Sequence, residues 1–170
     1  MDLQELIDAR TIEQTLVRYF DRIDALDPFG AAALFADDAT ANLMTGKVYE
    51  GRASIGRALA RILLQYRHTS HHISNHRAEI DGDEAASLTY IYAFHRFPDG
   101  RIWHLWCRNT DRFRRVGSEW KITERVLIPI DSDPPWDLID DDWYMTHPGR
   151  KTSDEVAAEL DTSYAERAGR

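Results

Sequence analysis

The hydrophobic pattern of this chain changes period once, and that change constrains its fold more than any other feature. Up to about residue 66, apolar residues recur three or four positions apart, as on one face of an amphipathic helix. Beyond that point apolar and polar residues alternate, as in half-buried strands, over residues 70–80, 85–97, 101–115 and 119–130. Short turns that contain glycine separate these stretches. Helices followed by a four-stranded antiparallel meander predict an α+β fold.

The first half of the chain predicts three helices of unequal length. The longest spans residues 3–26 and ends at Asp27-Pro28, and a short helix follows over 31–35. Residues 43–49 are expected to hold short extended segments, and Ser54 is expected to cap a third helix that runs to about residue 66. A sheet that curves strongly around the first helix would form a cone-shaped α+β barrel, whose cavity suits a small apolar ligand.

The composition excludes several classes of function. The 170 residues carry 29 acidic and 21 basic side chains, a formal net charge of −8, so no basic excess favours nucleic acid. No apolar run approaches the ~20 residues of a membrane span, and the acidic N-terminus lacks the features of a secretory signal. Cys107 is the only cysteine, which fits a reducing compartment. We therefore expect a cytoplasmic protein that binds neither nucleic acid nor membrane.

The acidity is concentrated at the C-terminal end. Residues 1–130 hold 18 acidic and 17 basic side chains, whereas residues 131–170 hold 11 acidic and 4 basic ones. We expect one domain over 1–130 and an acidic extension over 131–170 that packs on the body or on a neighbouring subunit. The apolar residues in the extension argue against disorder, and its last helix is expected from about 153 to 167.

Four histidines lie close together in the sequence and raise the question of a metal site. On a helix, His68, His72 and His76 would share one face. The β-branched residues among them favour a strand instead, on which residues four apart lie ~13 Å from each other and do not share one ion. We therefore expect no metal. Strand alternation sends His71 to one face of the sheet, and His72 and His76 to the other.

Other catalytic motifs are missing from the sequence. It contains no nucleophile elbow, no glycine-rich dinucleotide motif and no P-loop, and Cys107 falls in the middle of an expected strand. We therefore expect no cofactor. Acid–base chemistry remains, of the kind used in dehydration, dehydrohalogenation or double-bond isomerisation.

Asp24 is the most informative carboxylate. It lies near the end of the helix expected over 3–26, one residue after Ile23 and four after Phe20, at the rim of the apolar face. A carboxylate at such a position is costly unless it is paired. From the residues alone, Asp24 is either a solvated residue of the helix end or the partner of another polar group.

Four segments give the chain a resemblance to a known family. They read RYFDRID (18–24), LFADDA (34–39), HHISN (71–75), and DRF (111–113) followed by WKI (120–122). In order and spacing they resemble the SnoaL-like branch of the nuclear-transport-factor-2-like superfamily, over about residues 5–130. The resemblance implies the same α+β cone. It leaves the function open, because the superfamily includes scytalone dehydratase, hexachlorocyclohexane dehydrochlorinase, bile-acid dehydratases, polyketide cyclases, steroid isomerases and non-catalytic small subunits of ring-hydroxylating dioxygenases.

The resemblance implies a catalytic pair. In scytalone dehydratase and the dehydrochlorinase an aspartate pairs with a histidine on the first long strand, which here makes Asp24 the partner of His71, or of His72 if a bulge exchanges the two. A carboxylate bonded to an imidazole fixes its tautomer, which suits proton abstraction. Resemblance to scytalone dehydratase also marks His95 as catalytic and Asn109 as substrate-binding. The alternatives are an exposed strand end for His95 and a strand residue bonded to backbone for Asn109.

Other relatives imply two further site residues. A bile-acid dehydratase has a tyrosine five residues before its aspartate, as Tyr19 lies here, which makes Tyr19 a catalytic candidate. The dehydrochlorinase has an arginine five residues after a tryptophan, as Arg125 lies here, which makes Arg125 a substrate-binding candidate. Alternation from Ile122 turns Arg125 outward unless a bulge intervenes, and a salt bridge to Asp111 or Glu124 is its other possible role.

Together these residues predict a cofactor-independent lyase. Its substrate is expected to be a small apolar hydroxy compound, alicyclic, steroid-like or polyketide-like, and dehydration is the expected reaction. His71 would take the proton and Asp24 would hold His71, while Tyr19 and His95 would assist at the leaving hydroxyl or an enolate oxygen. The alternatives are a non-catalytic module of the dioxygenase small-subunit type, and an isomerase or cyclase.

The expected outer face of the sheet predicts a homo-oligomer. Aromatic side chains at Tyr90, Tyr92 and Trp106 leave more apolar surface than a monomer usually exposes. Residues 131–148 are expected to cover the cavity mouth as a lid, with a bridge between subunits as the alternative.

Overall fold

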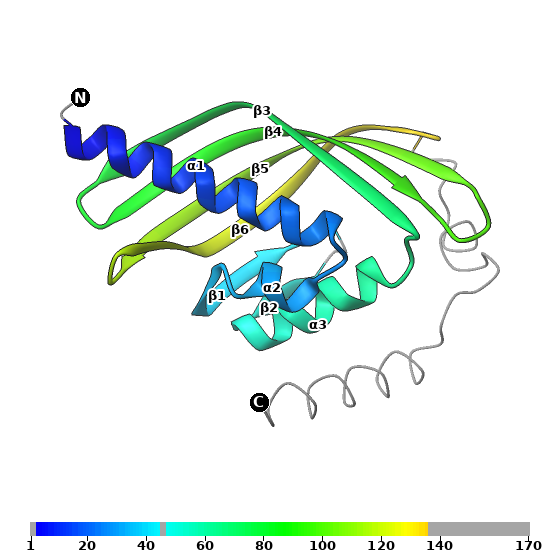
Figure 1. Ribbon diagram of the computed structural model, residues 1–170, viewed down its shortest axis with the longest axis horizontal. Coiled ribbons are helices and arrows are strands. Elements are labelled where there is room, and N and C mark those ends of the chain that lie inside the picture. The colour runs from blue at the N-terminus through cyan, green and yellow to red at the C-terminus, as the bar shows by residue number, and fades with distance from the viewer. Residues whose placement is uncertain (1–2, 45–46, 136–170) are drawn as a thin grey trace.

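The computed structural model describes residues 3–44 and 47–135, which form helices packed on one mixed sheet (Figure 1). The helices are α1 (Leu3–Asp24), α2 (Pro28–Ala32) and α3 (Arg52–Leu63). The strands are β1 (Phe35–Asn42), β2 (Val48–Glu50), β3 (His68–Asp81), β4 (Glu84–Arg96), β5 (Ile102–Val116) and β6 (Glu119–Asp133). Their order in the sheet is β2-β1-β6-β5-β4-β3. The expected α+β class is confirmed.

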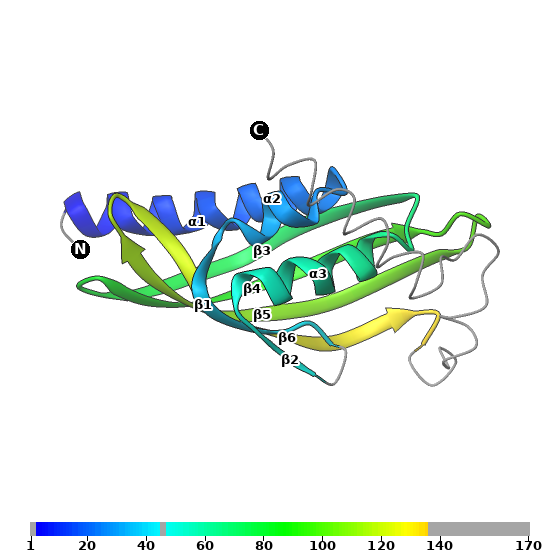
Figure 2. The ribbon, with the colours of Figure 1, turned by 90° about the horizontal axis from the view of Figure 1, so that it is seen from below.

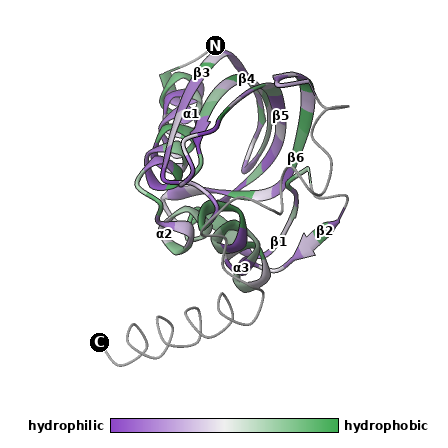
Figure 3. Cartoon of the chain, turned by 90° about the vertical axis from the view of Figure 1, so that its right-hand side faces the viewer, coloured by the Kyte–Doolittle hydropathy of each residue, from purple (hydrophilic) through white to green (hydrophobic). Residues whose placement is uncertain are grey.

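The sheet is strongly curved, and the helices lie on its inner side. Strands β3 to β6 form the expected antiparallel meander, and β1 adds to it in parallel beside β6. Helix α1 runs along the sheet next to β3, and α3 lies near β1 (Figures 1 and 2). Seen end-on, β3 to β6 curve around the space that α1 and α3 flank (Figure 3). The result is the expected cone, with an unclosed sheet.

Helix α1 forms because its apolar residues recur at helical spacing, and it buries the face that this spacing predicts. Ile12 and Leu16 are fully buried, and Tyr19, Phe20 and Ile23 nearly so. None of the described helices is long and apolar enough to cross a membrane.

The strands of the first half differ from the prediction. Residues 35–42 form β1, where the pattern predicted the end of a short helix and no strand. Thr40 is the only β-branched residue among them, so the segment carries little strand signal of its own. It is extended because its backbone pairs with β6, for example Ala41 with Arg125. The short helix lies earlier than expected, at 28–32.

Helix α3 also begins and ends earlier than expected. Its N-cap is Gly51, not Ser54, and its last residue is Leu63. Gly51 has a φ of 78°, a left-handed conformation that glycine adopts without strain. The chain therefore turns sharply from β2 into the helix before Ser54 is reached.

A β-bulge in β3 changes which of its side chains face inward. The register with β4 shifts between Ser74 and Arg77, where Asn75 has a φ of 48°. The alternation reverses across the extra residue, so His76 faces inward and its Nδ1 lies 2.9 Å from the Oγ1 of Thr89. The predicted outward placement of His76 was therefore wrong.

A second bulge determines which face of the sheet the Arg125 side chain occupies. The register of β5 with β6 shifts between Arg112 and Phe113, so that Phe113 pairs with Ile122 while Arg112 pairs with Glu124. One residue of β6 is thereby skipped. Ile122 and Arg125 both face inward and are both buried.

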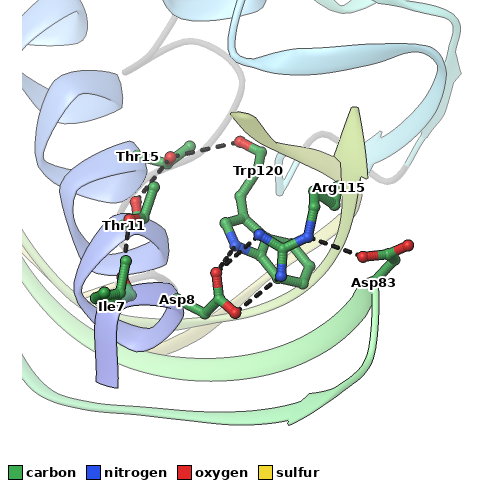
Figure 4. Close-up of polar contacts among 7 residues, drawn as sticks. All are labelled: Ile7, Asp8, Thr11, Thr15, Asp83, Arg115 and Trp120. Carbon is green, nitrogen blue, oxygen red and sulfur yellow. Dashed lines mark hydrogen bonds and ion pairs between the residues drawn. The ribbon is translucent and has the colours of Figure 1, made fainter. Parts of the chain in front are cut away.

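The N-terminal end of α1 is tied to the β5–β6 hairpin by a buried carboxylate (Figure 4). The two oxygens of Asp8 accept hydrogen bonds of 2.8 Å from Nη1 and Nη2 of Arg115, and the indole N–H of Trp120 donates to Asp8 at 3.1 Å. The guanidinium also lies over the Trp120 ring, 4.4 Å from its centroid, and its Nε donates to Asp83. The hydrogen bonds from Arg115 lower the pKa of Asp8 well below its usual value, although burial opposes the shift.

Replacing Asp8 should destabilise the fold. The Asp8→Ala variant leaves the buried N–H of Trp120 without its acceptor, and Arg115 keeps only Asp83 as a partner. We expect this to lower the free energy of unfolding by about 1–3 kcal/mol. Asp38→Ala is the matched control, because Asp38 pairs with Arg114 on the exposed surface. Urea unfolding followed by tryptophan fluorescence measures both. Equal losses in the two variants would contradict a special role for Asp8.

The same carboxylate should make the fold sensitive to acid. The pKa of Asp8 is lower in the folded state than in the unfolded chain, so its contribution to stability is present above the unfolded pKa of about 4 and is lost as the pH falls further. An Asp8→Asn variant should therefore lose less stability than the wild type between about pH 4 and pH 2. Urea unfolding at a series of pH values measures this difference. Parallel pH profiles would show that Asp8 is not the responsible group.

Candidate active site

A cavity of about 500 Å³ lies between the inner face of the sheet and the helices. Its walls are mostly apolar and come from α1, α3 and the middle of β4 and β5, including Phe20, Leu59, Ile91 and Leu105. Polar side chains are few in its lining, and they include all but one of the candidates that the sequence singled out: Tyr19, His71, His95, Asn109 and Arg125. An apolar cavity with a few converging polar groups is the usual form of a small-molecule site.

Asp24 is the candidate that does not line the cavity, because it lies behind His71. Its Oδ1 accepts a hydrogen bond of 2.6 Å from the His71 ring nitrogen Nδ1, and its Oδ2 accepts one of 2.9 Å from the His71 backbone N–H. The His71 ring stacks on Phe20, with centroids 5.0 Å apart. These three contacts hold the ring with Nδ1 toward the carboxylate, which leaves Nε2 as the nitrogen available for chemistry. The expected contact is present, and His71, not His72, faces the cavity.

His95 is buried in the cavity wall, not exposed at a strand end. Its ring lies between Tyr66 and Trp103, with centroid distances of 4.5 and 5.1 Å. It is nearly perpendicular to the ring of His71, with the two centroids 5.4 Å apart. Burial, with a smaller contribution from His71, lowers the pKa of His95 to about 3. The ring is therefore neutral at physiological pH, and it offers one donor and one acceptor without a charge.

Arg125, which lines the cavity, forms a buried ion pair with Asp111. Nε and Nη2 of Arg125 donate hydrogen bonds of 2.7 and 2.9 Å to the two carboxylate oxygens of Asp111, and both side chains are almost completely buried. The guanidinium also lies over the Tyr19 ring, 4.1 Å from its centroid. Burial disfavours the cation, but Asp111 and Tyr19 outweigh it and raise the pKa of Arg125. The predicted salt bridge to Asp111 is present, and it coexists with a place in the cavity lining.

Tyr19 and Asn109 complete the polar lining. Burial raises the pKa of the Tyr19 phenol, although Arg125 opposes the shift, so the hydroxyl stays protonated. Asn109 is 1% exposed, and its Oδ1 has no hydrogen-bond partner among the described residues. An unpartnered acceptor in a cavity wall is a position at which a bound molecule or water donates a hydrogen bond.

Several lining residues were not predicted from the sequence. Tyr66 follows α3, and Leu59, Ile62 and Leu63 come from α3 itself. Their signal was the apolar stripe of that helix, which indicated a packed face but not a cavity. Cys107 also lines the cavity, and burial raises the pKa of its thiol to about 12, so it is not a nucleophile at neutral pH. Within residues 3–44 and 47–135, no three His, Cys, Asp or Glu side chains are gathered as a metal ion requires.

The acidic extension falls almost entirely outside the described residues. Strand β6 continues past residue 130 and pairs with β5 up to Asp133, opposite His104. The expected lid over 131–148 lies mostly beyond this point, and the helix expected over 153–167 lies wholly beyond it. Both stay predictions.

Comparisons with known proteins agree with this architecture. A solved structure from Novosphingobium aromaticivorans, assigned as a scytalone dehydratase, is 28% identical with a TM-score of 0.71, over 75% of this chain and 87% of that one. A type 2 hexachlorocyclohexane dehydrochlorinase, LinA, is 17% identical with a TM-score of 0.71, over 78% and 91% of the two chains. The type 3 enzyme from Novosphingobium barchaimii is 15% identical with a TM-score of 0.69, over 76% and 90%.

Sequence comparison points the same way. A search of curated proteins finds no match. The family model of the SnoaL-like domain matches residues 4–126, which is most of the chain. The chain therefore belongs to the SnoaL-like domain family of the nuclear-transport-factor-2-like superfamily.

Proposed function

We propose that this protein is a cofactor-independent lyase that dehydrates an apolar hydroxy compound of alicyclic, steroid-like or polyketide-like structure. The observation that carries the proposal is the Asp24–His71 pair, in which a carboxylate orients an imidazole at the wall of an apolar cavity. Structural neighbours that are assigned as a dehydratase and a dehydrochlorinase support lyase chemistry in general.

In the proposed reaction, Nε2 of His71 removes a proton from the carbon next to the one that bears the hydroxyl. The C–H electron pair forms the C=C bond, the C–O bond breaks, and the leaving hydroxide takes a proton to become water. The Asp24 carboxylate faces Nδ1 and offers a counter-charge to the imidazolium that forms. His71 returns to its neutral form when its proton passes to the leaving group, so the products are the alkene and one water.

The remaining polar groups would bind oxygen atoms of the substrate without exchanging protons. His95 is neutral and Tyr19 is protonated at physiological pH, so each is a hydrogen-bond donor to a leaving hydroxyl or an enolate oxygen. Asn109 and Arg125 would orient the substrate from the cavity wall. The charge of Arg125 is neutralised by Asp111, which favours an uncharged substrate over an anionic one.

The outer face of the sheet supports the expected assembly. Tyr92 and His104 are joined there by a hydrogen bond of 2.7 Å between the phenol and Nδ1, and the neighbouring Trp106 ring is 41% exposed. An exposed aromatic surface of this kind is typical of an interface. The homo-oligomer and the cytoplasmic location both stay proposals.

The dyad is tested by turnover of a panel of hydroxylated alicyclic ketones, steroids and polyketide-like compounds, with mass spectrometry to detect loss of water. Asp24→Asn and His71→Ala should each lower the rate by about 10²–10⁴-fold, and the double variant by little more, since the two groups act as one unit. His72→Ala, on the opposite face, is the matched control and should keep full activity.

The outcomes separate the alternatives. A product of unchanged mass would indicate an isomerase or cyclase that uses the same residues. Binding of panel compounds without any product would indicate a non-catalytic module. Full activity in His71→Ala would contradict the proposed chemistry itself.

The neutral state of His95 is tested without a substrate. Nitrogen NMR of the ring should show neutral imidazole from pH 7 down to about pH 4, since burial holds its pKa near 3. In a His71→Phe variant the pKa of His95 should rise, because the second imidazole no longer opposes its charge. A titration midpoint above about pH 5 in the wild type would contradict this assignment.

A further inference from the structure

A patch of polar side chains continues from the cavity along the inner face of the sheet toward the β3–β4 and β5–β6 turns. We call it the polar floor, and it consists of His76, Ser87, Thr89, Asn109, Asp111 and Arg125. The strand register makes it continuous, because Thr89 pairs with Asn109 across β4 and β5, and Ser87 pairs with Asp111 in the adjacent row. Asp111 pairs in turn with Arg125 across β5 and β6. His76 joins the floor through its hydrogen bond to Thr89.

Four buried polar atoms of this floor have no hydrogen-bond partner within the described part of the chain. They are Nε2 of His76, Oγ of Ser87, Oδ1 of Asn109 and Nη1 of Arg125. Buried polar atoms in folded proteins are almost always paired, and where no protein group pairs them an ordered water does. Four such atoms on one continuous patch therefore indicate a group of buried waters.

A second cavity, which we call the notch, lies beside the His76 end of the floor. It lies between α1 and β3 and is lined by Ala9 and Glu13 on the helix and by His76 on the strand, among others. The bulge at Asn75, with its positive φ, is the part of β3 that borders the notch. His76 thus faces the notch and the floor at once, while Asn109 and Arg125 face the floor and the catalytic cavity.

His76 is suited to carry a proton or a water between the two sides. Its Nδ1 is hydrogen-bonded to the Thr89 hydroxyl, and its Nε2 is the unpaired buried atom. Burial lowers the pKa of His76, although Glu13 and Asp111 oppose the shift, so the ring stays neutral at physiological pH with one donor and one acceptor.

We propose that a file of buried waters runs from the notch past His76 and over the polar floor to the catalytic cavity, and that it lets water and protons pass without using the cavity mouth. The inferred use of this route rests on the proposed function, because each dehydration releases one water into an apolar cavity. The route itself is a property of the folded protein and needs no turnover.

The test combines a crystal structure at a resolution that shows ordered water with oxygen-17 relaxation dispersion of the protein in solution, which measures the residence time of buried waters. The wild type should hold waters in hydrogen-bond contact with all four unpaired atoms. The His76→Phe variant should lose the water at His76, and its remaining floor waters should exchange more slowly, because the phenyl ring closes the path. His72→Phe, on the other face of β3, is the matched control and should change neither.

A second variant keeps the test decisive if His76→Phe does not fold. Ala9→Phe fills the notch from α1 and replaces none of the floor residues, so it should leave the waters at Ser87, Asn109 and Arg125 in place and lengthen their residence time. A dry floor in the wild type would overturn the proposal. Unchanged residence times in the folded blocking variants would overturn the route, since the waters would then exchange through the mouth. Neither result depends on whether the protein proves to be a lyase.

Discussion

Two carboxylates hold helix α1 against the curved sheet, one near each end, and the cavity depends on both. Asp8 reaches the β5–β6 hairpin through Arg115 and Trp120. Asp24 reaches β3 through the backbone and the ring of His71. Between these points the helix turns a mostly apolar face to the sheet, interrupted by the buried hydroxyl of Thr15, which contacts the Trp120 carbonyl, and by Tyr19 at the cavity wall. The same attachment that positions the helix therefore orients the imidazole.

Two effects set the charge of each polar group in the cavity: burial away from water, and the presence or absence of an oppositely charged partner. Arg125 keeps its charge because the carboxylate of Asp111 is buried beside it. His95 has no carboxylate partner in the described ranges, so burial lowers its pKa and the ring is neutral. The two polar ends of the cavity thus differ in kind. One holds a fixed, neutralised cation, and the other holds a neutral ring beside an oriented histidine.

Much of this arrangement was predictable, and the remainder depended on pairing between distant segments. Alternation located the four long strands, and helical spacing placed Asp24 at the rim of α1, because both patterns are local. The inward turn of His76 and of Arg125 was not predictable, since each depends on a bulge that appears only when two strands are aligned. Strand β1 was missed for a similar reason, as its sequence is poor in β-branched residues and its conformation comes from β6. The partner of Asp24 was suggested by family resemblance and not by spacing.

The bulge in β3 has a consequence for the exposed edge of the sheet. At the opposite edge, β2 is only three residues long, whereas β3 spans fourteen, and among its outer backbone groups the N–H of His71 is bonded to Asp24. A long, regular edge is a template on which an unfolded or foreign chain adds a strand. The left-handed residue at Asn75 interrupts that template near its middle, so that no incoming strand can follow β3 along its whole length. The irregularity that turns His76 inward thus also protects the protein against aggregation through this edge.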